Sequence, residues 1–418
     1  MDQNQAFLRA LRAALRGRTV SWTGAGPGKG PDSPETWGRL LRMASVHNVL
    51  PMVYEAVWPC PAFSAVPESV RAQCKGEVIH MVARQVSSTA RFLQLYRALC
   101  AGGVEPVVVK GLICRSLYPQ PDHRPSSDED LLVPPDRFAA CHALLLQNGL
   151  RVMNPQTDPD TAFEVSYLDP RTGFYLEVHK SLFEPGSGAV GDFNACFEDC
   201  FSRAVWQTVE GVSVRTLAPQ DHLLYLILHA FKHFIHSGFG IRQICDIILM
   251  AEANGPAIDW AKLLRRCESL HAAVFAASVF KIGTEHLGFD RTAAGYPAAW
   301  QTIPVDAGPM LRDILSGGVY GAADSDRQHS STITLNAVEA ARTGGKSSVL
   351  QSVFPARSQL VGRYPVLKKW PVLLPAVWAD RLFHYGKELA RGGGQGAAQS
   401  VSIGRQRVDL MRYYKIIR

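Results

Sequence analysis

The segment from Val107 to Val133, VVVKGLICRSLYPQPDHRPSSDEDLLV, limits the fold of this 418-residue chain more than any other part of it. It begins with a β-branched run that is typical of a buried strand and ends at Lys110-Gly111. A short helix and a loop follow, and a second strand begins at Asp128-Glu129-Asp130. Because alternate residues of a strand point to the same side, Asp128 and Asp130 are expected to direct two carboxylates to one point. The segment predicts a sheet with paired acids beside the Lys110 turn.

A third acid lies further along the chain, in FYLEVHKSLF at 174–183. This run is predicted to form another strand, on which Glu177 and His179 share a face. Three converging carboxylates (Asp128, Asp130 and Glu177) suit Mg²⁺ or Mn²⁺, since hard cations take oxygen ligands and often bind together with phosphates. Gly111, between a strand and a helix, would let a phosphate approach backbone N–H groups. We interpret the pattern as a phosphate-and-metal site, and the alternative is a set of solvated acids at strand ends.

The rest of the sequence predicts an α+β fold. Apolar residues recur at helical spacing over most of 1–104, and short β-branched runs occupy 105–217. Helical periodicity returns over 218–290, and 291–418 are expected to form a basic C-terminal arm with a Gly-rich hinge at 391–400. The expected core is therefore a small mixed sheet with helices, flanked by N-terminal and C-terminal helical regions.

The charge of the chain is unevenly distributed. The whole sequence has 44 Lys and Arg against 37 Asp and Glu, a net charge of +7, and a content of 47% hydrophobic residues fits a globular protein. Residues 342–418 carry fourteen basic and three acidic residues, so the rest of the chain is mildly acidic. This excess is far from that of a dedicated nucleic-acid coat, and a nucleic-acid partner is not favoured.

A basic and aromatic run, LKKWPVLLPAVWADRLFHY, occupies residues 367–385. Lys and Arg mixed with Trp and Leu are typical of helices that lie on an anionic membrane surface. The favoured alternative is an arm whose apolar side chains pack on the protein, because prolines at 365, 371 and 375 prevent one long amphipathic helix. Nine scattered cysteines without a CxxC pair, together with an N-terminus that does not look like a secretory signal, indicate the cytoplasm.

Three histidines share one face of the helix predicted over 221–236. His229, His233 and His236 are spaced so that they lie on successive turns. They could bind a transition metal, or they could form a hydrogen-bonding face against the sheet. The neighbouring Lys232 would repel a cation, so we favour His229 and His233 as residues that line a nucleotide or acceptor cleft.

The sequence resembles a bacterial family of uncharacterised nucleotidyltransferases, within the DNA-polymerase-beta-like superfamily. The helical runs at 37–57 and 221–247, with Asp246 in the second, and the C-terminal segment add to the likeness, which covers most of the chain. The motifs that carry it are Lys110-Gly111, Leu117-Tyr118-Pro119, Arg124-Pro125, Asp128-Glu129-Asp130-Leu131-Leu132-Val133 and Glu177-Val178-His179.

The resemblance implies transfer of a nucleoside monophosphate from an NTP such as ATP to a hydroxyl acceptor, with release of pyrophosphate. It implies that Asp128 and Asp130 bind two Mg²⁺ ions and that Glu177 completes the metal site. The candidate phosphate contacts are Lys110, Arg124 and Lys232. The acceptor could be a small molecule, a sugar, a peptide or a protein side chain.

Two positions depart from the superfamily pattern. Lys110-Gly111 stands where a Gly-Gly or Gly-Ser pair is usual, and Glu129 stands between the aspartates where an apolar residue is usual. An outward-facing Glu129 would leave the strand register intact, whereas an inward-facing one would shift it. A binding or regulatory protein that keeps the fold without turnover is therefore the competing hypothesis.

Overall fold

The computed structural model describes residues 3–22, 31, 33–185, 191–236, 238–318, 357–360, 364, 366–380 and 396–417. The chain divides into two compact units. The first comprises Met1–Ala230 and Gly240–Ala307, and the second comprises Phe231–Phe239 and Gly308–Arg418. The positions of the predicted boundaries near 104, 217 and 290 all lie in residue ranges of the first unit, and the predicted division into domains stays a prediction.

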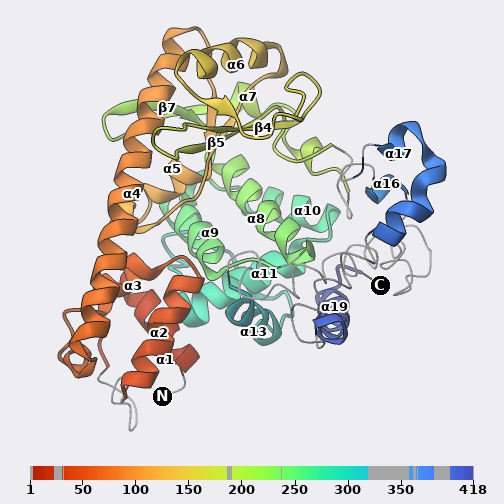
Figure 1. Cartoon of the computed structure of the whole chain (residues 1–418). Coiled ribbons are helices and arrows are strands. Elements are labelled where there is room, and N and C mark those ends of the chain that lie inside the picture. The colour runs from red at the N-terminus through yellow and green to blue at the C-terminus, as the bar shows by residue number, and fades with distance from the viewer. Residues whose placement is uncertain are drawn as a thin grey trace. The chain divides into compact units, whose positions relative to one another are not determined.

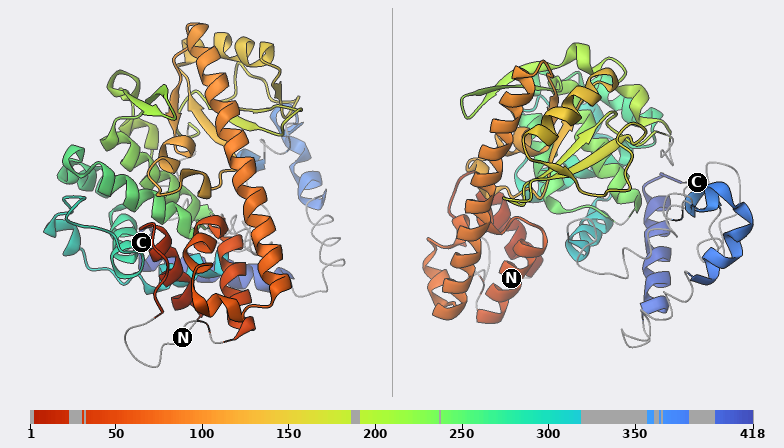
Figure 2. Two further views of the ribbon diagram at one scale, coloured as in Figure 1. Left: turned by 90° about the vertical axis from the view of Figure 1, so that its left-hand side faces the viewer. Right: turned by 45° about the horizontal axis from the view of Figure 1, so that its top comes forward.

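Helices form the described N-terminal part of the first unit, the red and orange segments of Figure 2. Ser33 caps the second helix by accepting the Thr36 N–H, and Pro34 occupies its first turn, so the sequence itself marks where this helix begins. The long fourth helix lies in the region 1–104, where helical spacing predicted helices, and it contacts the third. The elements are α1 (Gln3–Ala14), α2 (Pro34–Val46), α3 (Leu50–Val57), η1 (Pro61–Ala65) and α4 (Glu68–Ala101).

A seven-stranded mixed sheet forms the centre of the first unit, in the order β3-β4-β5-β2-β1-β7-β6. Two of its pairings, β1 with β7 and β2 with β5, are parallel, and the others are antiparallel. The strands are β1 (Val107–Val109), β2 (Glu129–Leu132), β3 (Arg151–Val152), β4 (Glu164–Leu168), β5 (Tyr175–His179), β6 (Val205–Val209) and β7 (Val212–Thr216). The α+β prediction is confirmed, although the sequence analysis missed β3 and β6.

Short helices connect these strands. One face of β4 and β5 is apolar and buried, and α6 lies on it, where His142 bonds with the hydroxyl of Tyr167 (2.7 Å). Figure 1 shows α6 above the sheet and α8 and α9 below it. The connecting elements are α5 (Gly111–Arg115), η2 (Pro121–His123), η3 (Pro135–Arg137), α6 (Phe138–Gln147), η4 (Phe193–Cys196) and α7 (Cys200–Arg203).

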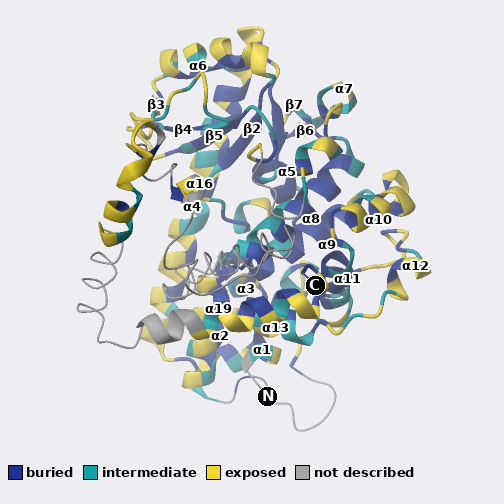
Figure 3. Cartoon of the chain, turned by 90° about the vertical axis from the view of Figure 1, so that its right-hand side faces the viewer, coloured by how far each residue is buried: buried dark blue, intermediate teal, exposed yellow. Residues whose placement is uncertain are grey.

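Helices after the sheet complete the first unit. Figure 3 shows that α8 and α9 are largely buried, whereas α6 and α10 expose their outer faces. No helix among the described residues combines the length and the apolar character that crossing a membrane requires. The elements are α8 (Pro219–His236), which continues into the second unit, α9 (Ile241–Ala253), η5 (Gly255–Ala257), α10 (Trp260–Ser269), α11 (Ala273–Ile282), the π-helical turn η6 (Gly283–Leu287) and α12 (Ala298–Gln301).

The second unit contains α13 (Gly308–Gly317), α16 (Arg357–Leu360), α17 (Val366–Lys369), η8 (Pro371–Leu373) and α19 (Gly396–Tyr413). Arg407 of α19 is buried and pairs with Asp313 of α13 (2.8 Å), and it also donates to the carbonyl of Phe234. Because α19 begins at Gly396, the second half of the predicted hinge is helical, which corrects that prediction. Residues 391–395 lie outside the described residues.

Candidate active site

The register of two parallel strands brings the main site residues together. Asp130 of β2 lies opposite Glu177 of β5, and His179 follows two residues later on the same face. The Nε2 atom of His179 lies 3.1 Å from Asp130 Oδ1 and 3.7 Å from Glu177 Oε2. One ligand atom from each of these three residues lies within 4.8 Å of the others. Two carboxylates and an imidazole offer the oxygen and nitrogen ligands that divalent cations accept, so the donor set fits such an ion.

Glu164 adds a fourth titratable group to this face. It lies on β4 opposite His179, and its Oε2 atom is 3.4 Å from His179 Nδ1. The hydroxyl of Tyr175 donates to Glu177 Oε1 (3.0 Å) and so orients that carboxylate. The antiparallel pairing of β4 with β5 therefore surrounds His179 with carboxylates on both sides.

The two central acids differ in their protonation behaviour. Burial and the neighbouring Asp130, Glu164 and Asp128 raise the pKa of Glu177 to about 7. Burial would also raise the pKa of Asp130, but Lys110 and His179 outweigh it and hold that pKa below its ordinary value. The raised pKa of Glu177 is expected in a crowded anionic site, where like charges cannot all ionise.

Lys110 supplies the counter-charge to Asp130. Its Nζ atom lies 3.0 Å from Asp130 Oδ1 and 3.2 Å from His229 Nε2. The ammonium also lies 5.9 Å from the centre of the Tyr225 ring, within range of a cation–π interaction. The geometry brings Lys110 together with His229 and Tyr225 of α8, and their predicted roles as a phosphate contact and a cleft-lining residue stay predictions.

The backbone of Lys110 is strained. Its backbone φ of +52° lies in the left-handed region that residues other than glycine rarely adopt. The buried His222 accepts the Lys110 N–H at Nε2 (3.1 Å), and burial, with a contribution from Lys110, lowers the pKa of His222 to about 4. A neutral imidazole can accept this bond, so His222 stabilises a conformation that would otherwise cost about 1–3 kcal/mol.

Glu129 is buried on the opposite side of β2 from Asp130. Its Oε1 atom accepts from Arg115 (2.6 Å), and its Oε2 atom accepts the N–H of Leu112 (3.0 Å). A Cβ atom at Gly111 would overlap this carboxylate, which gives the glycine a structural role. Glu129 therefore faces the interior without the register shift that the sequence analysis linked to that orientation. The α5 amide at Leu112 binds this glutamate, and phosphate binding at Gly111 stays a prediction.

Arg124 is also placed differently from the sequence-based expectation. Its guanidinium is buried and forms two bonds of 2.7 Å with the carboxylate of Asp246 on α9. The hydroxyl of Tyr118 donates to the same carboxylate (2.7 Å), and Arg242 donates to the carbonyl of Pro125. These contacts fasten the loop before β2 to α9. Arg124 therefore acts as a structural clamp, and the phosphate contact that we predicted for it stays a prediction.

Asp128 lies at the entry to β2 and is partly exposed. The hydroxyl of Ser126 donates to the Asp128 carbonyl (2.8 Å), and the Ser126 N–H donates to Gln85 of α4 (2.7 Å). Asp128 is close enough to raise the pKa of Glu177, but it is outside the compact group of Asp130, Glu177 and His179. Its predicted role as a metal ligand stays a prediction.

Lys232 and His233 lie further along α8, within the part of that helix that belongs to the second unit. Both side chains are partly exposed. Their expected roles, as a phosphate contact and as a cleft-lining residue, stay predictions.

Sequence reasoning missed His222, Glu164 and Arg115. His222 precedes His229 by seven residues, which is two helical turns, so the shared face was a signal that could have found it. Arg115 follows Gly111 by four residues in a short helix, but only the fold shows that it meets Glu129. Glu164 carries no local signal, because its place depends on the pairing of β4 with β5.

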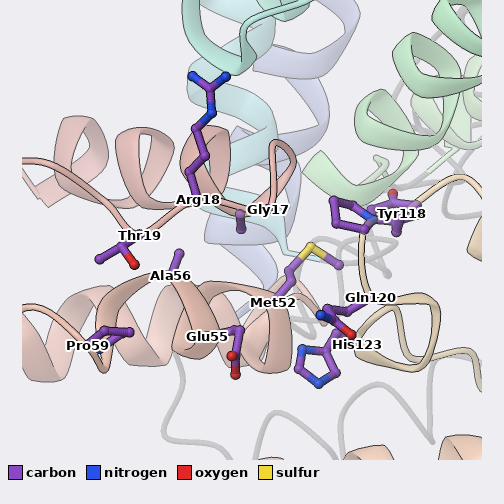
Figure 4. A pocket seen from close by; sticks show the side chains of 12 residues that line it. Gly17, Arg18, Thr19, Met52, Glu55, Ala56, Pro59, Tyr118, Gln120 and His123 are labelled. Carbon is purple, nitrogen blue, oxygen red and sulfur yellow. The ribbon is translucent and has the colours of Figure 1, made fainter.

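A separate pocket lies beside the loop that connects α5 to β2 (Figure 4). Burial lowers the pKa of His123, one of the residues at its edge. Its lining contains none of the residues of the Asp130 site, and comprises Ala14, Gly17, Arg18, Thr19, Met52, Glu55, Ala56, Pro59, Tyr118, Pro119, Gln120 and His123.

Comparison with known proteins agrees with this geometry. Residues 33–288 match the model of the family described as uncharacterised nucleotidyltransferase. No curated protein and no solved structure matches the chain. Nucleotidyltransferases in general use a divalent cation and an NTP, and the group of Asp130, Glu177 and His179 could hold such a cation. Since the match covers more than half of the sequence, the chain belongs to this uncharacterised nucleotidyltransferase family.

Proposed function

We propose that the protein is a metal-dependent nucleotidyltransferase that moves a nucleoside monophosphate from an NTP such as ATP to a hydroxyl acceptor. The observation that carries this proposal is the pairing of Asp130 with Glu177 across two parallel strands, beside Lys110. In the reaction, the acceptor hydroxyl gives up its proton to solvent, and its oxygen bonds to the α-phosphorus while the bond from this phosphorus to the pyrophosphate oxygen breaks. Pyrophosphate leaves with the electron pair of that bond.

Asp130 and Glu177, with Asp128 at the strand entry, would hold Mg²⁺ or Mn²⁺. A bound cation would lower the pKa of the acceptor hydroxyl and would stabilise the charge of the triphosphate. Lys110 lies where its ammonium could pass from Asp130 to a phosphate oxygen, and His229 would hold it in reach. These residues would act by positioning and by charge stabilisation, with no covalent step at a side chain.

A second candidate function has its own supporting observation. The ammonium of Lys110 already neutralises Asp130, as a cation would. In a protein that binds a nucleotide or a partner through this fold without turnover, this ion pair would take the place of the metal ion. The two candidates differ in whether pyrophosphate is released.

The test is to incubate the purified chain with each labelled NTP and with Mg²⁺ or Mn²⁺, and to measure pyrophosphate release, self-labelling and NTP binding. Asp128→Ala/Asp130→Ala should abolish all metal-dependent signals. Asp136→Ala is the matched control, because Asp136 is an exposed acid of the first unit whose side chain is 77% exposed. Metal-dependent binding without pyrophosphate release would favour the second candidate. Binding that is unchanged in the double variant would refute the role of these acids in both.

A further inference from the structure

A small folded tip in the second unit exposes apolar side chains. It runs through α17 (Val366–Lys369), η8 (Pro371–Leu373) and the helical residues that follow up to Asp380. The tip has its own core, in which Leu360, Leu367 and Val377 are buried and Tyr364, Leu374 and Trp378 pack against them. These side chains already provide the apolar contacts that hold the tip together.

Hydrogen bonds tie the two sides of this tip to each other. Arg357 Nε donates to the carbonyl of Leu367 (2.9 Å), and the hydroxyl of Tyr364 donates to Asp380 (3.0 Å). The N–H of Leu373 reaches the carbonyl of Trp370 (3.2 Å) and forms the turn between the helical segments. The turn at residues 370–373 is therefore supported from both sides.

The apolar residues of the turn itself lie in solvent. Trp370 is 55% exposed, Val372 is 77% exposed and Leu373 is 38% exposed, and Val366 beside them is 44% exposed. Leu367 and Val377 are buried within the tip's own core, whereas the apolar residues of the turn are exposed, and the packing of this run on the rest of the protein stays a prediction. Exposing a large apolar side chain to water costs free energy. A cluster of such side chains on a turn that hydrogen bonds hold in place therefore indicates that another surface covers the turn.

The charge around the turn complements one kind of surface. Among the described residues of the tip, Lys368 and Lys369 directly precede Trp370, Asp380 is the one acid from Val366 to Asp380, and Lys369 at the turn is exposed. Basic residues beside exposed Trp and aliphatic side chains match the boundary between anionic headgroups and acyl chains. A Trp ring is favoured at that depth because it has an apolar body and a polar N–H.

We propose that this turn binds an anionic lipid surface, with Trp370, Val372 and Leu373 entering the headgroup boundary and Lys369 facing the lipid phosphates. The contact is peripheral and reversible, since it involves one short turn. It does not depend on the nucleotidyltransferase proposal, because all of its residues lie in the second unit.

The test is co-sedimentation of the full-length protein with vesicles. One set contains phosphatidylcholine alone, and the other also contains about 30% phosphatidylglycerol, which gives a strongly anionic surface. We expect binding to the anionic vesicles only, with binding weaker at high salt. The variant Trp370→Ser/Val372→Ser/Leu373→Ser should bind at least about tenfold more weakly, a difference of about 1.4 kcal/mol. Circular dichroism should be unchanged, since the substituted side chains are exposed.

The matched control is Val205→Ser/Trp206→Ser on β6 of the first unit, where the two side chains are 40% and 52% exposed. This variant should bind vesicles like the unaltered protein. The proposal is overturned if the unaltered protein stays in solution with anionic vesicles, or if the tip variant sediments as well as it does. A gel shift with RNA or DNA that the tip variant abolishes, without any vesicle binding, would assign the turn to a nucleic acid instead.

Discussion

The ion pair between Arg115 and Glu129 allows a sharp test of how the core of the site is built. The two side chains are 1% and 2% exposed, and Arg115 NH2 lies 2.6 Å from Glu129 Oε1. The substitution Glu129→Leu keeps the approximate volume but leaves a buried guanidinium without its carboxylate. It also removes the acceptor of the Leu112 N–H.

The expected cost follows from these contacts. Removing one partner of a buried ion pair typically costs about 3–5 kcal/mol, and the lost amide bond adds about 1 kcal/mol. Replacing both partners, as in Arg115→Met/Glu129→Leu, should recover most of this loss, because the unpaired charge is then gone. Glu129→Gln should fall between, since it keeps an acceptor for Leu112 without the charge.

The measurement is hydrogen exchange of the β1 and β2 amides, followed by mass spectrometry, since it reports on this sheet and not on the second unit. A loss of about 4 kcal/mol would make globally protected amides exchange about a thousandfold faster. The matched control is Glu105→Leu, which breaks the more exposed 3.7 Å pair with Arg215 and should cost less than about 1 kcal/mol. A cost below about 1 kcal/mol for Glu129→Leu, or a double variant no more stable than the single one, would refute the reasoning.

Three further predictions concern the site and the Arg124–Asp246 clamp. Lys110→Met should raise the affinity for Mn²⁺, measured by calorimetry, because the lysine holds Asp130 at 3.0 Å; a lower affinity would contradict the competition. The free energy of unfolding should fall by up to about 3 kcal/mol as the pH rises from about 4.5 to about 7. The reason is the raised pKa of Glu177, because the folded chain binds a proton in that range that the unfolded chain has lost. Urea titrations should show that Glu177→Gln flattens this pH dependence. Asp246→Asn should cost about 3–5 kcal/mol and should speed the hydrogen exchange of the loop before β2, because the Arg124 guanidinium loses its buried carboxylate; unchanged exchange would contradict the clamp.

Local sequence patterns predicted much of the fold. The runs that begin at Val107, Asp128 and Phe174 each contain a strand, and the helical spacing expected over most of 1–104 and over 221–236 corresponds to helices. The short strands β3 and β6 were missed, since a run of two to five residues with exposed positions leaves little periodicity to detect. The helical start of α19 was missed because glycines near 391–400 favour a break in any local assessment.

The sequence by itself determined that Asp128 and Asp130 lie near the start of one strand, and that Glu177 and His179 share a face of another. Alternation along a strand is a local property, so the residue order is sufficient to establish it. Only the tertiary structure decided that these strands are neighbours in parallel, with Asp130 opposite Glu177. Strand order depends on long-range burial and pairing, which no single segment encodes.

The same distinction explains the residues whose roles changed. Arg124 meets Asp246 across 122 positions of the chain, and Lys110 meets His229 across 119. Charge and motif position identified all four side chains as notable, but a basic residue near acids can contact a phosphate or pair with a buried carboxylate. The choice depends on which groups the fold buries together, because a buried charge must find its partner there. The tertiary structure therefore pairs Arg124 with Asp246 and places Lys110 beside Asp130.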